Sequence, residues 1–214
     1  MEALNIVKSE QGSPEWFSAK LGVISASNIK NVLAKKGTEA RAGYISELVA
    51  QIATGEMPEV NARALEWGRF QEENARSAYE FAADVEVIQI GFIYGLDKRI
   101  GCSPDGIING KKKGVEIKCP FTSKVHVDFL AMDKIKLDYI YQVQFSMWVA
   151  DFGEWDFCSF DPRFKKQLLK IHTLERDPEM MKRFDDEVPA FIAEMDAVLK
   201  KIGVQFGDQW VVHG

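Results

Sequence analysis

Apolar side chains recur every three or four positions in several stretches of the chain, a spacing that gives a helix one apolar face. This pattern predicts helices over residues 39–55, 61–84, 139–150 and 177–203. Two shorter helices are predicted over residues 13–20 and 25–36, because each stretch begins at a serine, which caps helix N-termini well. Pro189 lies inside the last helix and lacks a backbone N–H, so we expect a kink or an interruption there.

The pattern changes where β-branched residues become frequent and glycines recur. It predicts consecutive strands of a meander over residues 85–95, 99–109 and 114–120, and further strands over residues 154–161 and 168–175. Helices followed by strands, a helix, strands and a helix predict the α/β class, with a mixed central β-sheet flanked by helices. The 214 residues are enough for a sizeable core and most simply form one domain over residues 1–214.

The composition narrows the class of protein. No run of eighteen apolar residues is present, and the first residues lack the pattern of a signal peptide, so we expect a cytoplasmic protein without membrane contact. The three cysteines form no Cys-x-x-Cys pair and the three histidines are far apart in the sequence. Zinc and disulfides are therefore not expected, and a metal would be held by oxygen atoms.

The formal net charge of -5 is unevenly distributed. Residues 16–45 contain five basic residues and one acidic residue, and residues 98–136 contain nine basic and four acidic residues. A surface with two signs suits a protein that presents a basic face to phosphates. Solvated charges scattered over helices would give the same counts, so the charge alone does not decide the function.

The stretch CSPDGIINGKKKGVEIKCP, residues 102–120, contains acidic and basic side chains close together in the sequence. The Asn-Gly pair at 109–110 predicts a hairpin that brings Asp105 beside Glu116. Side chains two positions apart on a strand share a face, so Glu116 and Lys118 should point the same way and Ile117 into the core. An ordinary solvent face with a cross-strand ion pair is the alternative interpretation.

Two facing carboxylates repel each other unless a cation lies between them, and oxygen ligands suit Mg²⁺. The carbonyl of Ile117 would add a third ligand to Asp105 and Glu116. Lys118 beside such a metal would orient a water or stabilise charge on a phosphate. This combination indicates phosphodiester hydrolysis.

SPDG followed by GVEIKCPFTS resembles the PD…(D/E)XK nuclease signature. The resemblance extends to the phage lambda exonuclease family, whose members are YqaJ-type viral recombinases, and covers residues 16–210. Its further segments are LGVISASNIKNVLAK, TGEMPEVNARALEWGRFQEENAR, YQVQFSMWV, FDPRF and VPAFIAEMDAVLKKIG…FGDQW. The resemblance implies a restriction-endonuclease-like fold.

The family resemblance implies a Mg²⁺-dependent 5′-to-3′ exonuclease, with Mn²⁺ as a possible substitute. Such an enzyme degrades one strand of linear double-stranded DNA to mononucleotides and leaves 3′ single-stranded tails. The family forms homotrimer rings around DNA and works with a single-strand annealing protein in phage recombination inside a bacterial host. A DNA-end-binding protein without turnover and an endonuclease of the same superfamily remain as alternatives.

Carried over residue by residue, the resemblance makes Asp105, Glu116 and the Ile117 carbonyl metal ligands, and Lys118 the residue that acts on the attacking water. Glu72 matches a family carboxylate near the metals. These assignments agree with the roles that the strand geometry suggests for the same stretch.

Two further matches have ordinary structural alternatives. Gln142 matches a glutamine on the helix beside the catalytic site, although glutamines on helices more often face solvent. Leu65 matches an apolar residue that wedges between the separating strands, although a core leucine has the same spacing.

The 5′-phosphate pocket implied by the family falls on Lys20, Ser27 and Ser103. Ser27 would offer its hydroxyl and the amides of a helix start. The family has an arginine where this chain has Lys20, and lysine keeps the charge but not the bidentate fork. The family also has an acidic residue upstream of SPDG, for which Asp97 is the candidate.

Overall fold

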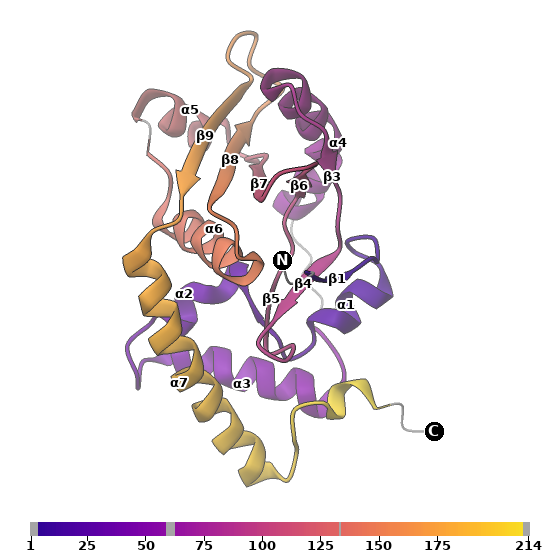
Figure 1. Ribbon diagram of the computed structural model, residues 1–214, viewed down its shortest axis with the longest axis vertical. Coiled ribbons are helices and arrows are strands. Elements are labelled where there is room, and N and C mark those ends of the chain that lie inside the picture. Colours follow the sequence, from indigo (N-terminus) through magenta and orange to yellow (C-terminus); the bar gives the residue numbers. More distant parts are fainter. Residues whose placement is uncertain (1–3, 59–62, 133, 212–214) are drawn as a thin grey trace.

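The computed structural model describes residues 4–58, 63–132 and 134–211 (Figure 1). Its helices are α1 (Pro14–Lys20), α2 (Ile29–Val32), α3 (Glu39–Thr54), α4 (Arg63–Ala83), α5 (Ser123–Met132), α6 (Leu137–Ala150) and α7 (Pro178–Ile202), with the 3-10 turns η1 (Ala26–Asn28) and η2 (Asp208–Trp210). Its strands are β1 (Asn5–Val7), β2 (Ile24–Ser25), β3 (Val87–Ile88), β4 (Phe92–Gly95), β5 (Ile100–Cys102), β6 (Gly106–Ile108), β7 (Lys113–Lys118), β8 (Glu154–Phe160) and β9 (Leu169–Glu175).

The described strands form two sheets. The first has the order β1-β4-β5-β2 and the second the order β3-β6-β7-β8-β9. β2 pairs in parallel with β5 and β7 in parallel with β8, whereas the other pairs are antiparallel. The mixed α/β class is confirmed, with the strands divided between two sheets.

The division falls inside two stretches that the sequence pattern assigns to single strands. Residues 85–95 form β3 in one sheet and β4 in the other, and residues 99–109 form β5 and β6 in the same way. Pro104 lies at the second division, where it has no N–H to continue a ladder. Gly91 lies at the first, where an added Cβ would be 2.2 Å from the carbonyl oxygen of Ser9.

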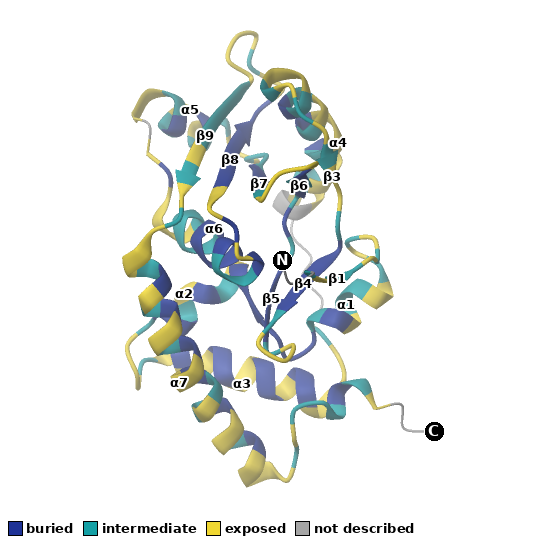
Figure 2. Cartoon of the chain, in the orientation of Figure 1, coloured by how far each residue is buried: buried dark blue, intermediate teal, exposed yellow. Residues whose placement is uncertain are grey.

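Helices cover both faces of the second sheet and place the candidate site between them. α6 packs against β4, β5 and β8 and against α7, and α4 packs against β7 and β9 (Figure 1). The larger core lies around α6, and Figure 2 shows β8 as mostly buried and α6 as a mixture of buried and intermediate residues. A smaller core, which contains Tyr79, Val115 and Ile117, lies between α4 and β7. One face of β7 therefore points towards α6 and the other towards α4.

Two of the predicted helices differ from the observed elements. The stretch predicted as a helix over residues 25–36 contains only the turn η1 and the single turn α2. α7 passes through Pro189 without a break, so the interruption considered there does not occur. Its apolar side, with Phe184, Val188 and Phe191, packs into the larger core and offsets the one missing hydrogen bond. Within the described ranges, no helix combines the length and apolar character needed to cross a bilayer.

Candidate active site

The hairpin of β6 and β7 brings two carboxylates together, as the sequence predicts. The turn contains residues 109–110, and β6 pairs antiparallel with β7. Asp105 precedes β6, and its backbone N–H donates to the carbonyl of Val115 over 3.2 Å. Its carboxylate accepts a hydrogen bond of 2.5 Å from the N–H of Ile117. These two hydrogen bonds hold Asp105 against β7, next to Glu116.

Glu116 is buried, with 2% of its surface exposed, and its carboxylate has two side-chain partners. Lys118 contacts the Oε1 atom of Glu116, and Gln142 on α6 donates to the same atom over 2.7 Å. Ile117 belongs to the smaller core on the opposite side of β7. The predicted facing of Glu116 and Lys118 is confirmed, and Gln142 faces this pair rather than solvent.

The site has more negative than positive charge. Burial raises the pKa of Asp105 well above its usual value, the charge of Glu116 adds to this, and Lys118 only partly opposes it. Burial alone would lower the pKa of Lys118, but the charges of Glu116 and Asp105 outweigh burial and raise it. Burial, followed by the charges of Asp105 and Glu72, raises the pKa of the neighbouring Cys119 thiol to about 12.

This donor set fits a hard divalent cation. Among the residues that the structure describes, no three His, Cys, Asp or Glu side chains form a metal site by themselves. Asp105 and Glu116 supply two carboxylates, the Ile117 carbonyl is the third expected ligand, and Glu72 is within electrostatic reach of Asp105. Mg²⁺ usually keeps several waters and needs only one or two protein carboxylates. A cation would also relieve the repulsion between Asp105 and Glu116.

Lys20 and Ser103 meet at Trp16. The ammonium of Lys20, at the end of α1, lies 3.7 Å from the centroid of the Trp16 ring. The indole N–H of Trp16 donates to the hydroxyl of Ser103 over 3.1 Å. Burial and then the positive charge of Arg69 lower the pKa of Lys20 to about 8. Arg69, on α4, is a neighbour of this pocket that the sequence pattern did not identify.

Ser27 is exposed in η1, and its hydroxyl lies 3.3 Å from that of Ser25. β2 and β5 pair in parallel with Ser25 opposite Gly101. This ladder ends at Ser25, and the chain continues into η1, which contains Ser27. Ser27 begins no long helix, because η1 and α2 span only seven residues between them. It therefore offers a hydroxyl rather than the N-terminus of an extended helix.

Of the other candidate residues, Asp97 lies apart from this cluster. Asp97 is exposed in the turn between β4 and β5, where Leu96, Asp97 and Lys98 all have positive φ angles. This turn is at the opposite end of β5 from Asp105, so Asp97 does not join the carboxylates. Leu65 falls within α4, but its side chain lies outside the described residues.

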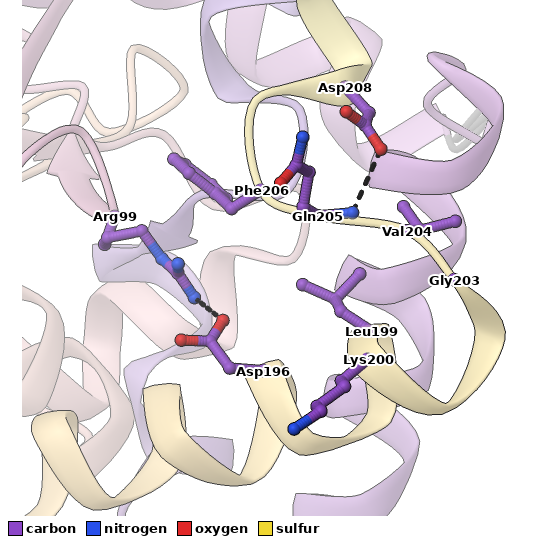
Figure 3. A pocket seen from close by; sticks show the side chains of 9 residues that line it. All are labelled: Arg99, Asp196, Leu199, Lys200, Gly203, Val204, Gln205, Phe206 and Asp208. Atoms are coloured by element: carbon purple, nitrogen blue, oxygen red, sulfur yellow. Dashed lines mark hydrogen bonds and ion pairs between the residues drawn. The ribbon is translucent and has the colours of Figure 1, made fainter.

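A cavity of about 660 Å³ lies away from the carboxylates, at the C-terminal end of α7 (Figure 3). Arg99 lines it and pairs with Asp196 over 2.5 Å. Because Arg99 directly precedes β5, this cavity is also at the end of β5 remote from Asp105. A smaller cavity of about 260 Å³ is lined by Lys118 and Tyr139, whose ring centroid is 5.2 Å from the Lys118 ammonium. The smaller cavity therefore adjoins the candidate site.

Comparisons with known proteins identify the family and similar folds. Residues 15–153 match the model of the YqaJ-like viral recombinase domain. ExoD of Escherichia coli (strain K12) is 45% identical over 78 residues, which are 36% of this chain and 90% of that protein. The alkaline exonuclease LHK-Exo of Laribacter hongkongensis is 32% identical, with a TM-score of 0.81 over 89% of this chain and 96% of that one. Another structure of LHK-Exo contains dAMP. A phage-related exonuclease of Haemophilus somnus 129PT shares the fold at 12% identity, with a TM-score of 0.65 over 84% of this chain and 96% of that one.

Proposed function

The chain belongs to the YqaJ-like viral recombinase domain family, and from this membership we propose that it is a Mg²⁺-dependent 5′-to-3′ exonuclease. Its substrate would be linear double-stranded DNA, one strand of which is degraded to mononucleotides. The remaining 3′ single-stranded tail would enter recombination by strand annealing. The observation that carries the proposal is the cluster of Asp105, Glu116 and Lys118 on one hairpin, in which Glu116 is buried and the other two are half-buried.

The side chains divide the work of hydrolysis. Asp105, Glu116 and the Ile117 carbonyl would hold the metal, with Glu72 nearby. The bound cation would supply a more acidic water and polarise the phosphoryl oxygens. Lys118, held against Glu116, would orient the attacking water and stabilise charge on the phosphate.

Gln142 belongs to α6, and its side chain points towards Glu116 on β7. Its amide N–H donates to Glu116, and its backbone carbonyl accepts a hydrogen bond of 3.0 Å from Ser146 in the next turn of the helix. Gln142 would therefore keep the Glu116 carboxylate in one orientation. This explains why a glutamine on α6 would matter to the chemistry without touching the substrate.

Lys20, Ser27 and Ser103 would bind the 5′-phosphate and set the distance between the DNA end and the scissile bond. Such placement contributes more to the rate than to affinity. Arg69 would add positive charge to the pocket. Leu65 would separate the two strands at the N-terminal end of α4.

A homotrimer ring is the proposed assembly. A single subunit with a net charge of -5 would hold duplex DNA weakly at physiological salt. Three copies of the basic segments 16–45 and 98–136 around one DNA axis would compensate and favour processive digestion. A single-strand annealing protein is the expected partner for the tail.

One set of substrates tests the activity. Purified protein is incubated with 5′-phosphorylated linear, 5′-hydroxyl linear and closed circular duplexes, with and without Mg²⁺. We expect Mg²⁺-dependent digestion of the linear substrates, faster with a 5′-phosphate, and loss of at least ~10²-fold with Asp105→Ala or Lys118→Ala. Binding without digestion would indicate an end-binding protein, cutting of the circle would indicate an endonuclease, and digestion in EDTA would refute the metal role.

A second experiment tests the ring. Light scattering at micromolar concentration gives the mass in solution, to be compared with 24.2 kDa for one subunit. Competitor DNA added after loading then measures processivity. A threefold mass with continued digestion is expected, whereas a monomer that stops at once when competitor is added would refute the ring.

A further inference from the structure

Asp161 and Arg163, in the loop that follows β8, form a closely bonded pair. The Asp161 side chain is fully buried, whereas Arg163 is 41% exposed. The Nε atom of Arg163 donates to one carboxylate oxygen over 2.7 Å, and an Nη2 N–H donates to the other over 2.8 Å. Burial would raise the pKa of Asp161, but hydrogen bonds from Arg163 and Ser123 hold it below its usual value. The aspartate therefore fixes the plane of the guanidinium.

The same guanidinium also binds the loop that follows β7. It donates to the carbonyl oxygens of Pro120 over 2.9 Å and of Phe121 over 3.0 Å. Its centre lies 4.8 Å from the ring centroid of Trp67, which belongs to α4. One side chain thus joins the loop after β8, the loop after β7 and the helix that carries Glu72. We call these contacts the Arg163 clamp.

The Arg163 clamp binds the backbone just beyond the end of the ladder between β7 and β8. The last pair in the parallel ladder between β7 and β8 is Lys118 with Ser159. Beyond Lys118 the backbone has no further ladder pair with β8. Two residues later, the carbonyl of Pro120 instead accepts a hydrogen bond from Arg163. Lys118 would otherwise lie at the free end of a strand, although its ammonium must stay against Glu116.

We propose that Arg163 is a positioning residue for the hydrolysis, because it fixes the backbone that follows Lys118 and the distance of this backbone from α4. This inference rests on the function proposed for Lys118. A misplacement of about 1 Å in a catalytic group can reduce a rate by about 10²-fold. Arg163 itself touches neither Glu116 nor Asp105 in the contacts described, and it acts through the chain that carries Lys118.

Arginine is the residue that this arrangement needs. Its planar fork reaches an aspartate, two carbonyls and an aromatic ring at the same time, whereas lysine has a single nitrogen. Arg163→Lys keeps the positive charge beside Asp161 but loses the fork. Arg163→Lys therefore tests whether the positive charge beside Asp161 is enough, or whether the planar guanidinium is needed to position the backbone after Lys118.

The experiment compares Arg163→Lys with the wild type and with Arg176→Lys. Arg176 is a matched control, since it pairs with Asp151 over 2.7 Å at 33% exposure and lies at the other end of β8 and β9. Single-turnover rates are measured with excess enzyme on a 5′-phosphorylated duplex, at a temperature where all three proteins are folded. We expect Arg163→Lys to lower the rate at least tenfold with DNA affinity changed less than threefold, and Arg176→Lys to match the wild type.

A second variant guards against a purely structural effect. Arg163→Ala is assayed with added methylguanidinium or methylammonium, and we expect only the planar cation to restore part of the rate. A wild-type rate in Arg163→Lys with a lower melting temperature would make Arg163 a stabilising residue only. Weaker DNA binding at an unchanged rate would make it a DNA contact. Absence of digestion by the wild type would instead refute the proposed nuclease function, independently of the two variants.

Discussion

If Lys20 binds the 5′-phosphate as proposed, the preference for a phosphorylated DNA end should depend on pH. Its ammonium packs on Trp16, and burial together with the charge of Arg69 lowers its pKa to about 8. At that value about nine tenths of the Lys20 side chains are protonated at pH 7 and about one tenth at pH 9. A phosphate monoester loses its second proton near pH 6, so the DNA end keeps its charge over this range. The positive charge of Lys20 is lost as the pH rises through about 8, and the proposed recognition of the phosphate should be lost with it.

The expected magnitude follows from these fractions. If only the protonated form distinguishes a phosphate from a hydroxyl, the preference falls about tenfold between pH 7 and pH 9. The bound phosphate stabilises the ammonium, so the midpoint near 8 applies to kcat/KM, which reports the free enzyme. The midpoint of the preference measured in kcat should lie at a higher pH.

The assay measures kcat/KM on two duplexes that differ only in their 5′ end, at intervals between pH 7 and pH 9.5. The ratio of the two values cancels every pH effect that both substrates share, including those at the metal site. Lys20→Arg is the control, because a guanidinium stays charged over this range and its ratio should be constant. A constant ratio in the wild type, or the same decline in Lys20→Arg, would refute the role of Lys20.

Three further predictions concern the site and the core. Asp105→Asn should raise the melting temperature in EDTA by about 2–4 °C, the response to about 1 kcal/mol, because it replaces a carboxyl group whose charged form is disfavoured by burial and by Glu116; a lower melting temperature in calorimetry would contradict this. Gln142→Ala should slow single-turnover digestion about tenfold, and Gln142→Glu should slow it more by adding a negative charge beside Glu116; equal rates would remove this contact from the mechanism. Phe184→Ala should cost about 3–5 kcal/mol in urea unfolding, because the ring is fully buried against other aromatic rings; a cost below about 1 kcal/mol would contradict this.

The sequence predicts the centre of the site because its geometry is local. Asp105, Glu116 and Lys118 belong to one hairpin, and the two-residue period of a strand is enough to place the last two on one face. Gln142 required more, since its contact with Glu116 spans 26 residues and joins a helix to a strand. Only the family resemblance singled it out.

The remaining features depend on contacts that no local rule contains. The division of residues 85–95 between two sheets follows from the close approach of Ser9 to Gly91, and α5 lies in a stretch to which the pattern assigned no element. The carbonyls that bind Arg163 are more than forty residues away in the sequence. The segment FDPRF therefore indicates the family, but its sequence does not show which carbonyl oxygens its arginine binds.

Burial, followed by the charges of Asp105 and Glu72, raises the pKa of the Cys119 thiol beside Lys118. Only the thiolate attacks alkylating agents and oxidants, and with a pKa of about 12 the Cys119 thiol has almost no thiolate at neutral pH. A divalent cation that neutralises Asp105 would lower this pKa, since the charge of Asp105 is part of its cause. The rate at which iodoacetamide labels Cys119 would then rise as the cation binds. The labelling rate would thus report occupancy of the proposed metal site without DNA or turnover.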